Sequence, residues 1–176
     1  MRPSPYDFLP PVPPLHLQSD DVADGQPLAI AHYAALSGLP GADDVSPHLA
    51  WSSAPAGTQS FVITMFDPDA PTPSGFWHWA IADLPSEISA LGRGAARARL
   101  PGTAFHVPND ARVPGYVGAA PPPGTGRHRY LIAVSALDVR SVAELGFVND
   151  GTPALLSFQL SGHVLARAVI APHAGV

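Results

Sequence analysis

The sequence predicts an all-β-dominant fold, a sandwich of two antiparallel sheets with one or two peripheral helices. Three stretches rich in β-branched and aromatic residues predict the main strands, at residues 60–66, 76–84 and 129–137. Proline supplies the second indication, because the chain has 22 prolines in 176 residues, more than double the usual share of about 5%. They are spread between apolar runs, which is typical of a β protein with many rigid loops.

The chain is long enough for one domain with a sizeable core, since 46% of its 176 residues are apolar. We expect this single domain to span residues 15–176. Residues 1–14 carry prolines at short intervals. They are predicted to form an extended tail that is either packed on the surface or partly disordered.

Three strands are expected in the first part of the domain. Residues 15–20 alternate apolar and polar side chains and predict a short strand, which the DGQ turn within residues 23–28 follows. A second strand is expected around Ala50 and Trp51. Residues 60–66 (SFVITMF) are apolar on both faces, so their strand should be central and buried.

The next part of the chain combines one strong strand with long connections. The strand at residues 76–84 (FWHWAIADL) is followed by a predicted helical turn at 86–92, with Ser86 as its N-cap and Gly92 at its end. Residues 92–127 are rich in Gly, Pro and Ala. They predict a long loop of the kind that is functional or disordered in most domains.

Helix signals come late in the chain. Ser141 and Glu144 have the spacing of a capping box, so a short helix should begin there. Thr152 followed by proline predicts the start of a helix over residues 153–169. Apolar side chains recur along it at helical spacing: Leu156, Leu160 and Val164.

Charge and composition exclude several function classes. The net charge is −5 with nine Lys plus Arg and no basic cluster, so no nucleic-acid partner is expected. The absence of cysteine excludes disulfides, thiolate zinc sites and cysteine nucleophiles. The chain starts without an apolar signal-peptide core and has no transmembrane segment, which would need about 18 continuous apolar residues. We therefore predict a cytoplasmic protein.

Two acids follow the central predicted strand in the stretch FDPDAPTPSGFWHW at residues 66–79. Asp67 and Asp69 share a face if the chain stays extended through Pro68, which restrains the residue before it. This arrangement suits a pocket wall. A solvated Asp-Pro turn after a strand explains the same residues equally well.

Histidine and tryptophan alternate at the start of the next strand. Strand parity places Trp77, Trp79 and Ile81 on one face, expected to be core, and turns His78 to the other. His78 is then either a structural histidine with satisfied hydrogen bonds or a pocket ligand.

A third polar group stands in GYVGAAPPPGTGRHRY, residues 115–130. His128 and Tyr130 share a strand face, while Arg129 points away. The Gly/Pro loop before them can present backbone N–H groups beside an imidazole, which is suitable for binding an anion. It lacks the GKS/T ending of a P-loop.

Taken together, these motifs resemble the phosphatidylethanolamine-binding protein (PEBP) family, in particular its bacterial Raf-kinase-inhibitor-like YbhB/YbcL branch. The resemblance rests on SP-x-L-x-W at 46–51, DPDAP at 67–71, WHW at 77–79 and G-x-x-PP-x-G-x-G-x-HRY at 118–130. Residues 156–170 also resemble the bacterial C-terminal helix. The likeness covers roughly residues 15–170.

The resemblance implies a Greek-key β-sandwich with a small anion pocket at one end. By motif position, the ligand-binding residues would be Asp67, Asp69, His78, Ala120 (through its backbone), Pro122, His128 and Tyr130. The sequence departs from the family at Gly118-Ala119, where GP is frequent, at Ala120, where Gly or Cys is frequent, and at Arg127, where Pro or Leu is frequent. The pocket mouth can thus differ in rigidity and charge.

We carry two main functional hypotheses forward. The first is a binding protein for a small anionic ligand or a phospholipid headgroup such as that of phosphatidylethanolamine, with a kinase or another protein as a possible partner and a possible homodimer. The second is an enzyme of lyase, cyclase or isomerase type that uses Asp67, His78 and His128 for acid–base chemistry. No catalytic residue is assured, and no cofactor is expected. A zinc or iron site of two histidines and an aspartate is a third option, although HxH and HxxxH spacings are absent.

Overall fold

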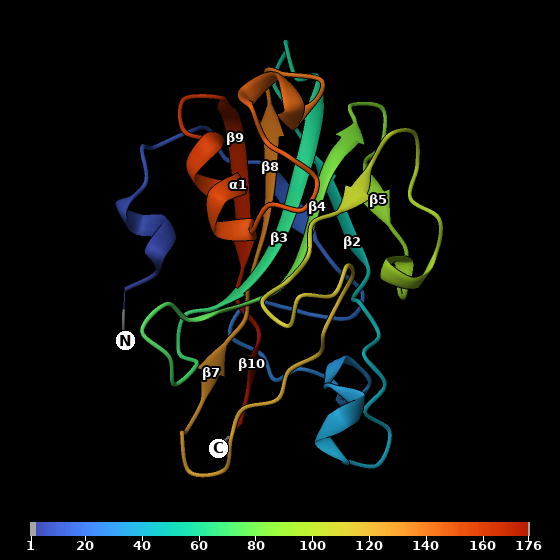
Figure 1. The fold of residues 1–176 in the computed structure, drawn as a ribbon, viewed down its shortest axis with the longest axis vertical. Helices are drawn as coiled ribbons and strands as arrows, with labels where there is room; N and C mark the ends of the chain where they lie inside the picture. Colours follow the sequence, from blue (N-terminus) through green and yellow to red (C-terminus); the bar gives the residue numbers. More distant parts are fainter. Residues whose placement is uncertain (1–2, 176) are drawn as a thin grey trace.

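A computed structural model describes residues 3–175, and its largest element is a five-stranded antiparallel sheet in the order β6-β4-β3-β8-β9 (Figure 1). Its strands are β3 (Ser60–Asp67), β4 (Phe76–Pro85), β6 (Phe105–His106), β8 (Leu131–Leu137) and β9 (Val164–Ile170). The apolar stretch expected at residues 60–66 is therefore the central strand, as predicted. Its side chains are buried on both faces of the sheet, apart from a half-buried Phe66.

A second antiparallel sheet, in the order β1-β2-β5, packs on one face of the first. It consists of β1 (His16–Gln18), β2 (Leu49–Ser52) and β5 (Ala90–Leu91). The two layers meet through aromatic contacts such as Trp51 against Phe61, whose ring centroids lie 5.4 Å apart. The predicted sandwich of two antiparallel sheets is confirmed.

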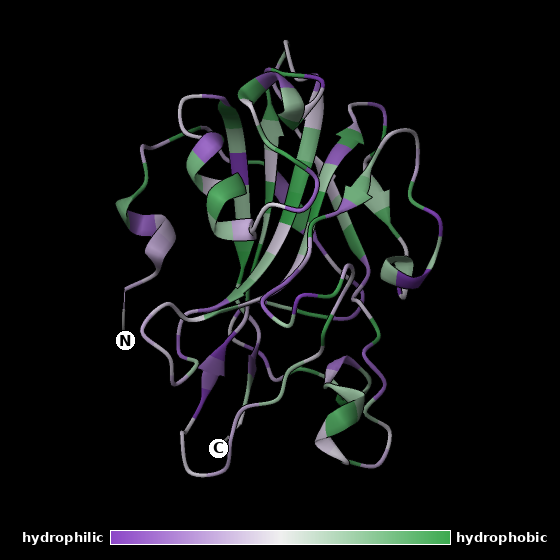
Figure 2. Cartoon of the chain, viewed as in Figure 1, coloured by the Kyte–Doolittle hydropathy of each residue, from purple (hydrophilic) through white to green (hydrophobic). Residues whose placement is uncertain are grey.

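A third pairing joins β7 (His128–Arg129) to β10 (His173–Ala174) below the sandwich (Figure 1). The strand predicted at 129–137 is thus interrupted at Tyr130. Figure 2 shows the difference between the two parts: β8 is hydrophobic, whereas β7 is strongly hydrophilic. The interruption carries His128 and Arg129 out of the large sheet toward its lower end.

The second face of the five-stranded sheet is covered by short helices. Helix α1 (Pro153–Gln159) and the 3-10 helix η5 (Val142–Leu145) bury Leu156 and Val142 against Val62 and Ala82. Ser141 caps η5 in the predicted capping box with Glu144. The remaining 3-10 helices lie in connections: η1 (Pro5–Phe8), η2 (Ile30–His32), η3 (Ala35–Ser37) and η4 (Ala95–Arg97).

The helical turn predicted at residues 86–92 is wrong. A turn closed by the Ile88 N–H on the Pro85 carbonyl leads instead into β5, which pairs with β2. Leu91 is buried in the core between the sheets. Burial of this leucine and the ladder bonds to β2 outweigh the local capping signal of Ser86 and Gly92.

The helix predicted over residues 153–169 is correct only at its start. Helix α1 ends at Gln159, and Gly162 adopts φ +85°, a conformation that an α-helix does not contain. Residues 164–170 form β9 at the edge of the large sheet, with Ala166 buried in the core. The expected likeness of 156–170 to a C-terminal helix fails for the same reason. The spacing of Leu156, Leu160 and Val164 matches the helical period only by coincidence, because the run is short.

The N-terminal segment packs on the surface beside β9 and is not extended throughout. Ser4 caps η1, and the Tyr6 hydroxyl lies 3.0 Å from Thr64 Oγ1 on the outer face of the sheet. The Arg167 N–H donates to the Pro13 carbonyl (3.0 Å), and the Leu15 N–H donates to the Arg167 carbonyl (3.1 Å). These two backbone bonds fasten the segment to the edge strand.

Residues 92–127 form a long irregular connection, as predicted, interrupted only by η4 and the short β6 within the described chain. Across residues 3–175, no helix has both the length and the apolar character needed to cross a membrane.

Candidate functional site

A β-bulge in β4 determines where His78 points. Met65 of β3 pairs with Trp79, but the next residue, Phe66, pairs with Trp77, so β4 carries one extra residue opposite β3. Strand parity had predicted that Trp77 joins Trp79 in the core. The bulge makes this prediction wrong for Trp77. It is half-buried and packs on Phe66, with ring centroids 4.4 Å apart.

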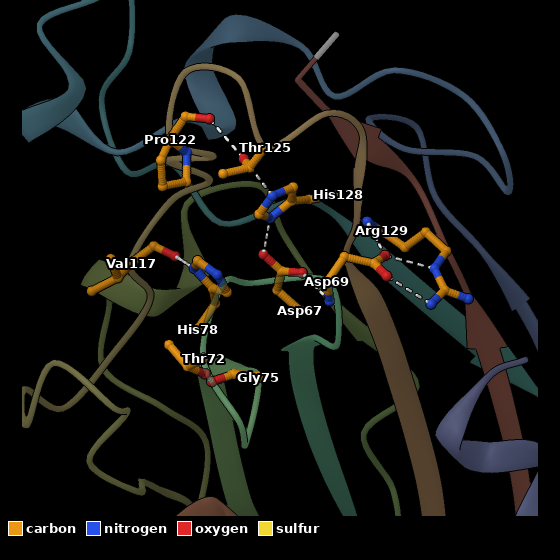
Figure 3. Close-up of polar contacts among 10 residues, drawn as sticks. All are labelled: Asp67, Asp69, Thr72, Gly75, His78, Val117, Pro122, Thr125, His128 and Arg129. Carbon is orange, nitrogen blue, oxygen red and sulfur yellow. Dashed lines mark hydrogen bonds and ion pairs between the residues drawn. The ribbon is translucent and has the colours of Figure 1, made fainter. Parts of the chain in front are cut away.

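The bulge turns His78 toward Tyr130 at the lower end of the sandwich. The two rings meet edge to face with their centroids 5.1 Å apart. His78 is buried, and its Nδ1 donates to the Val117 carbonyl at 2.9 Å (Figure 3). Burial lowers the pKa of His78, and the nearby Val117 carbonyl and Asp67 carboxylate only partly oppose this shift. A neutral His78 with Nδ1 protonated keeps Nε2 as a hydrogen-bond acceptor.

Asp67 and His128 form a buried pair at the end of β3. His128 Nδ1 donates to Asp67 Oδ2 at 2.7 Å, and both side chains are almost fully enclosed. On its other side, His128 Nε2 lies 2.8 Å from Thr125 Oγ1, which also contacts the Pro122 carbonyl at 2.7 Å (Figure 3). Both ring nitrogens of His128 are therefore occupied within the protein.

The hydroxyl of Thr125 has one proton and cannot donate to Pro122 and His128 at once. When it donates to His128, the bond across the loop to Pro122 is lost. The chain of contacts thus links Asp67 to the loop that bounds the lower end of the molecule.

Asp69 has a different partner from Asp67. The chain turns after Asp67, where the Asp69 N–H donates to Asp67 Oδ1 at 2.8 Å, so the predicted extended geometry is not present. Asp69 instead accepts from the Arg129 guanidinium, 2.7 Å from Nε to Oδ2 and 3.0 Å from Nη2 to Oδ1, and from the Arg129 backbone N–H at 3.1 Å. This bidentate contact raises the pKa of Arg129.

Tyr130 is the least satisfied of the predicted site residues. Its side chain is completely buried, yet its hydroxyl makes no hydrogen bond to residues 3–175. Burial, reinforced by the nearby Asp67 carboxylate, raises the pKa of Tyr130 and keeps it a neutral donor. The Ala120 backbone N–H slightly opposes the rise in the pKa of Tyr130, but an N–H cannot accept the hydroxyl proton, so this proton has no acceptor among the described residues.

The loop after Gly118, which closes the lower end of the sandwich, begins where the backbone of Gly118 lies close to the backbone of Tyr33. A Cβ at Gly118 would lie 2.3 Å from the Tyr33 carbonyl carbon, so no larger residue fits there. The Gly118 N–H donates to Asp44 Oδ1 at 2.7 Å, and Ala119 forms a β-bridge with Tyr33. The exposed Ala120 and Pro122 follow this anchored point.

A cavity of about 290 Å³ lies directly outside the buried cluster. Asp69, Thr125, Arg127 and Arg129 line it. Thr125 separates this cavity from His128, since its hydroxyl contacts the imidazole. The cavity has two cationic side chains, of which Arg127 is exposed, and none of Asp67, His78, His128 and Tyr130 lines it.

The sequence reasoning missed three participants of this site. Thr125 and Val117 were not named, and Arg129 was expected only to point away. Thr125 had a weak signal, as a hydroxyl three residues before His128 in a Gly-flanked turn. Val117 contributes a backbone carbonyl, which no side-chain motif reveals. Across the described residues, no group of three or more His, Cys, Asp or Glu side chains is arranged to hold a metal ion.

Comparisons with known proteins bear on the whole domain. The family described as phosphatidylethanolamine-binding protein matches residues 18–174. The UPF0098 protein YbhB of Escherichia coli K12 is 42% identical over 159 residues, covering 89% of this chain and 97% of that protein. The UPF0098 protein YbcL of the same strain is 35% identical over 157 residues, covering 88% and 84%.

Solved structures agree with these sequence matches. The crystal structure of E. coli YbcL, described as a new member of the mammalian PEBP family, superposes with a TM-score of 0.84 at 32% identity. The match covers 92% of this chain and 98% of that chain. A PEBP homologue from Chlamydia trachomatis gives a TM-score of 0.73 at 25% identity, covering 93% and 98%.

Proposed function

Because the chain belongs to the phosphatidylethanolamine-binding protein family, we propose that it binds a small phosphate-bearing or similar anionic headgroup. The site is the lower end of the sandwich, where Asp67, His78, His128 and Tyr130 converge (Figure 3 draws the first three). Pro122 and the Ala120 backbone belong to the loop that closes it.

The observation that carries this proposal is the buried, unpaired hydroxyl of Tyr130. Leaving a buried hydrogen-bonding group without a partner costs about 1–3 kcal/mol. A ligand oxygen that accepts from Tyr130 removes this cost. Sites where a native protein leaves a polar group unsatisfied are therefore reasonable places to expect a ligand.

The polarity of the neighbouring groups favours a ligand that carries both charges. Tyr130 offers a donor, and Arg127 and Thr125, which line the neighbouring cavity, offer a cation and a hydroxyl to a phosphate. Neutral His78 offers an acceptor at Nε2, and the Asp67 carboxylate favours an ammonium group. A zwitterionic headgroup such as phosphoethanolamine has both features.

The test is a titration of 15N-labelled protein with phosphoethanolamine, followed by the backbone amides of residues 117–130. We expect saturable shifts with a dissociation constant on the order of 1 mM or tighter, and weaker binding of phosphate or ethanolamine alone. Tyr130→Phe should weaken binding about tenfold, the equivalent of one hydrogen bond.

Tyr6→Phe is the matched control, because it removes a hydroxyl on the opposite face of the large sheet. Its affinity for phosphoethanolamine should equal that of the unmodified protein. The proposal is contradicted if no shifts appear at a phosphoethanolamine concentration 20-fold above the expected dissociation constant of about 1 mM. It is also contradicted if Tyr130→Phe binds phosphoethanolamine as tightly as the unmodified protein does.

Acid–base catalysis is the second candidate, because Asp67 orients His128 through a 2.7 Å hydrogen bond. Thr125 occupies the other nitrogen, so His128 reaches a substrate only if that contact opens. Turnover of a small molecule that is lost in Asp67→Asn and His128→Gln would support a lyase, cyclase or isomerase. Binding without turnover supports the first function.

Partners and compartment are part of the same proposal. A kinase or another protein partner, a homodimer and a cytoplasmic location are the expectations that accompany a regulatory binding protein. Native mass spectrometry of the purified protein tests the dimer and detects a co-purified ligand in one measurement. Cell fractionation tests the compartment.

A further inference from the structure

A second cavity lies on the outer face of the large sheet, away from the proposed headgroup site. It has a volume of about 160 Å³ and is enclosed by the N-terminal segment, the outer sheet face and the turn after α1. Tyr6 lies over it, Val62 and Ser135 form its floor, and Leu160 and Ser161 form one wall. In Figure 1 the N-terminal segment passes beside α1 and β9.

Arg167 is the only charged side chain that lines this cavity among residues 3–175. The backbone pairing places Val62, Ser135 and Arg167 in one row across β3, β8 and β9. The backbone of Arg167 is held on both sides by the bonds to Pro13 and Leu15. The arginine is therefore fixed at the cavity by the sheet and by the segment that covers it.

The guanidinium of Arg167 is half-buried and has no carboxylate within ion-pair distance in the described chain. Its Nε donates weakly to Ser135 Oγ at 3.3 Å, and its Cζ lies 5.6 Å from the centre of the Tyr6 ring. Asp7 lines an adjoining hollow, but its carboxylate accepts from the Ser4 N–H at 2.8 Å. Burial lowers the pKa of Arg167, and the neighbouring Tyr6 only partly opposes this shift.

A guanidinium has five N–H donors, and burying them without acceptors is costly. A carboxylate that meets Arg167 side-on supplies two acceptors and one compensating charge. A single cation favours a monoanion over a phosphate dianion. The apolar side chains of the lining, among them Val62, Leu160 and Val164, suit an apolar body, and the cavity has about the volume of one that holds benzene.

We propose that this cavity is a second ligand site, which binds a small organic carboxylate with its apolar body against Val62 and Leu160 and its charge on Arg167. The site is independent of the headgroup function, because it lies on the other face of the sheet and shares no residue with the Asp67–His128 cluster. The hydroxyls of Tyr6, Thr64 and Ser135 provide the polar rim.

The experiment is a 15N NMR titration of the full chain with sodium benzoate. Benzyl alcohol serves as a ligand of the same size without the charge. We expect saturable benzoate shifts at the amides of residues 62–64, 135 and 160–167, with a dissociation constant on the order of 1 mM. Benzyl alcohol should bind at least tenfold more weakly.

Variants separate charge from volume. Arg167→Gln should weaken benzoate at least tenfold, whereas the matched Arg140→Gln, an exposed arginine elsewhere, should change nothing. Ser161→Leu, at an exposed wall position, should block benzoate by filling the cavity, and it keeps the proposal testable if Arg167→Gln does not fold.

Three outcomes overturn the proposal. One is the absence of saturable shifts at the cavity amides when the benzoate concentration is 50-fold above the expected dissociation constant of about 1 mM. Another is equal binding of benzoate and benzyl alcohol, which would exclude a role for the charge. The third is benzoate shifts confined to residues 117–130, which would place the anion at the headgroup site and leave this cavity without a ligand.

Discussion

Strand β4 carries two bulges, and they serve opposite purposes. One lies at His78 and the other near Asp83, where β4 again has an extra residue opposite β3 and Asp83 adopts φ +57°. At the upper bulge, Asp83 accepts from Ser141 Oγ at 2.7 Å and from the Val142 N–H at 2.8 Å. Every contact there is made within the protein, and the carboxylate holds the start of η5.

At the lower bulge the hydrogen bonds are incomplete. His78 and the Asp67–His128 pair are as deeply buried as Asp83, yet the Tyr130 hydroxyl beside them has no partner among the described residues. The same backbone device therefore supports packing at one end and a binding site at the other. Buried polar residues alone do not identify a site; at the lower bulge the unpaired hydroxyl lies among several converging polar side chains, and this combination favours a binding site.

The largest expected effect is that of Asp67→Ala. It removes the acceptor of a buried hydrogen bond and leaves His128 Nδ1 unsatisfied, which should lower the free energy of unfolding by about 3 kcal/mol. Urea denaturation measures this change. Asp69→Ala is the matched control and should cost about 1 kcal/mol, because the Asp69–Arg129 pair is partly exposed. Equal losses of stability in Asp67→Ala and Asp69→Ala would show that the deeper burial of the Asp67–His128 pair does not increase its contribution.

Asp83→Ala should cost about 2 kcal/mol, since it removes both contacts that fix η5. Phosphoethanolamine binding at the other end should be unchanged once the variant is folded. Urea denaturation and the headgroup titration together check both statements. A loss of binding in Asp83→Ala would mean that the two ends of β4 are coupled.

Acid should destabilise the protein through His78. Its pKa is lowered in the folded state, so as pH falls through about 6.5 the unfolded chain takes up a proton that folded His78 does not. Stability from this group is present above that pH and declines below it, by at most about 1.4 kcal/mol per pH unit. His78→Gln should reduce the slope, measured as the difference in unfolding free energy between pH 7 and 5.

His106 and His173 also have pKa values lowered by burial, and they contribute equally to both proteins. The difference between His78→Gln and the unmodified chain therefore isolates His78. An unchanged slope would show that His78 has the same pKa in the folded and unfolded states.

Thr125→Val should cost about 1 kcal/mol, because the exposed Thr125 hydroxyl loses its contacts with Pro122 and His128, which water partly replaces. The measurable consequence is in the loop. Hydrogen exchange of the amides at 121–127 should accelerate, whereas exchange in β8 should not. Unchanged exchange would mean that the backbone turn, rather than the hydroxyl, holds the loop.

Tyr130→Phe should cost no stability and should instead raise the free energy of unfolding by about 1 kcal/mol, because it removes a buried hydroxyl that has no hydrogen-bond partner among the described residues. Tyr116→Phe is the matched comparison, since the buried Tyr116 hydroxyl donates to the His32 carbonyl at 2.9 Å. Its loss should cost about 1 kcal/mol. A loss of stability in Tyr130→Phe would contradict the absence of a hydrogen bond to this hydroxyl.

The family, the fold class and the strong strands followed from the amino-acid pattern alone. Alternation and β-branched content are properties of neighbouring residues, so β3, β4 and β8 were readable without tertiary information. The motif at 118–130 and the capping box at Ser141 are equally local. The resemblance to the PEBP family combined such local motifs, and the comparisons confirm it.

The folded chain decided what depends on distant partners. The bulge at His78 moved Trp77 out of the core, Asp67 and Asp69 diverged to His128 and Arg129, and residues 164–170 joined an edge rather than a helix. A one-residue change in register alters which face a side chain occupies. Edge pairing and ion pairs between residues 60 apart are set by packing, which no local pattern of residues encodes.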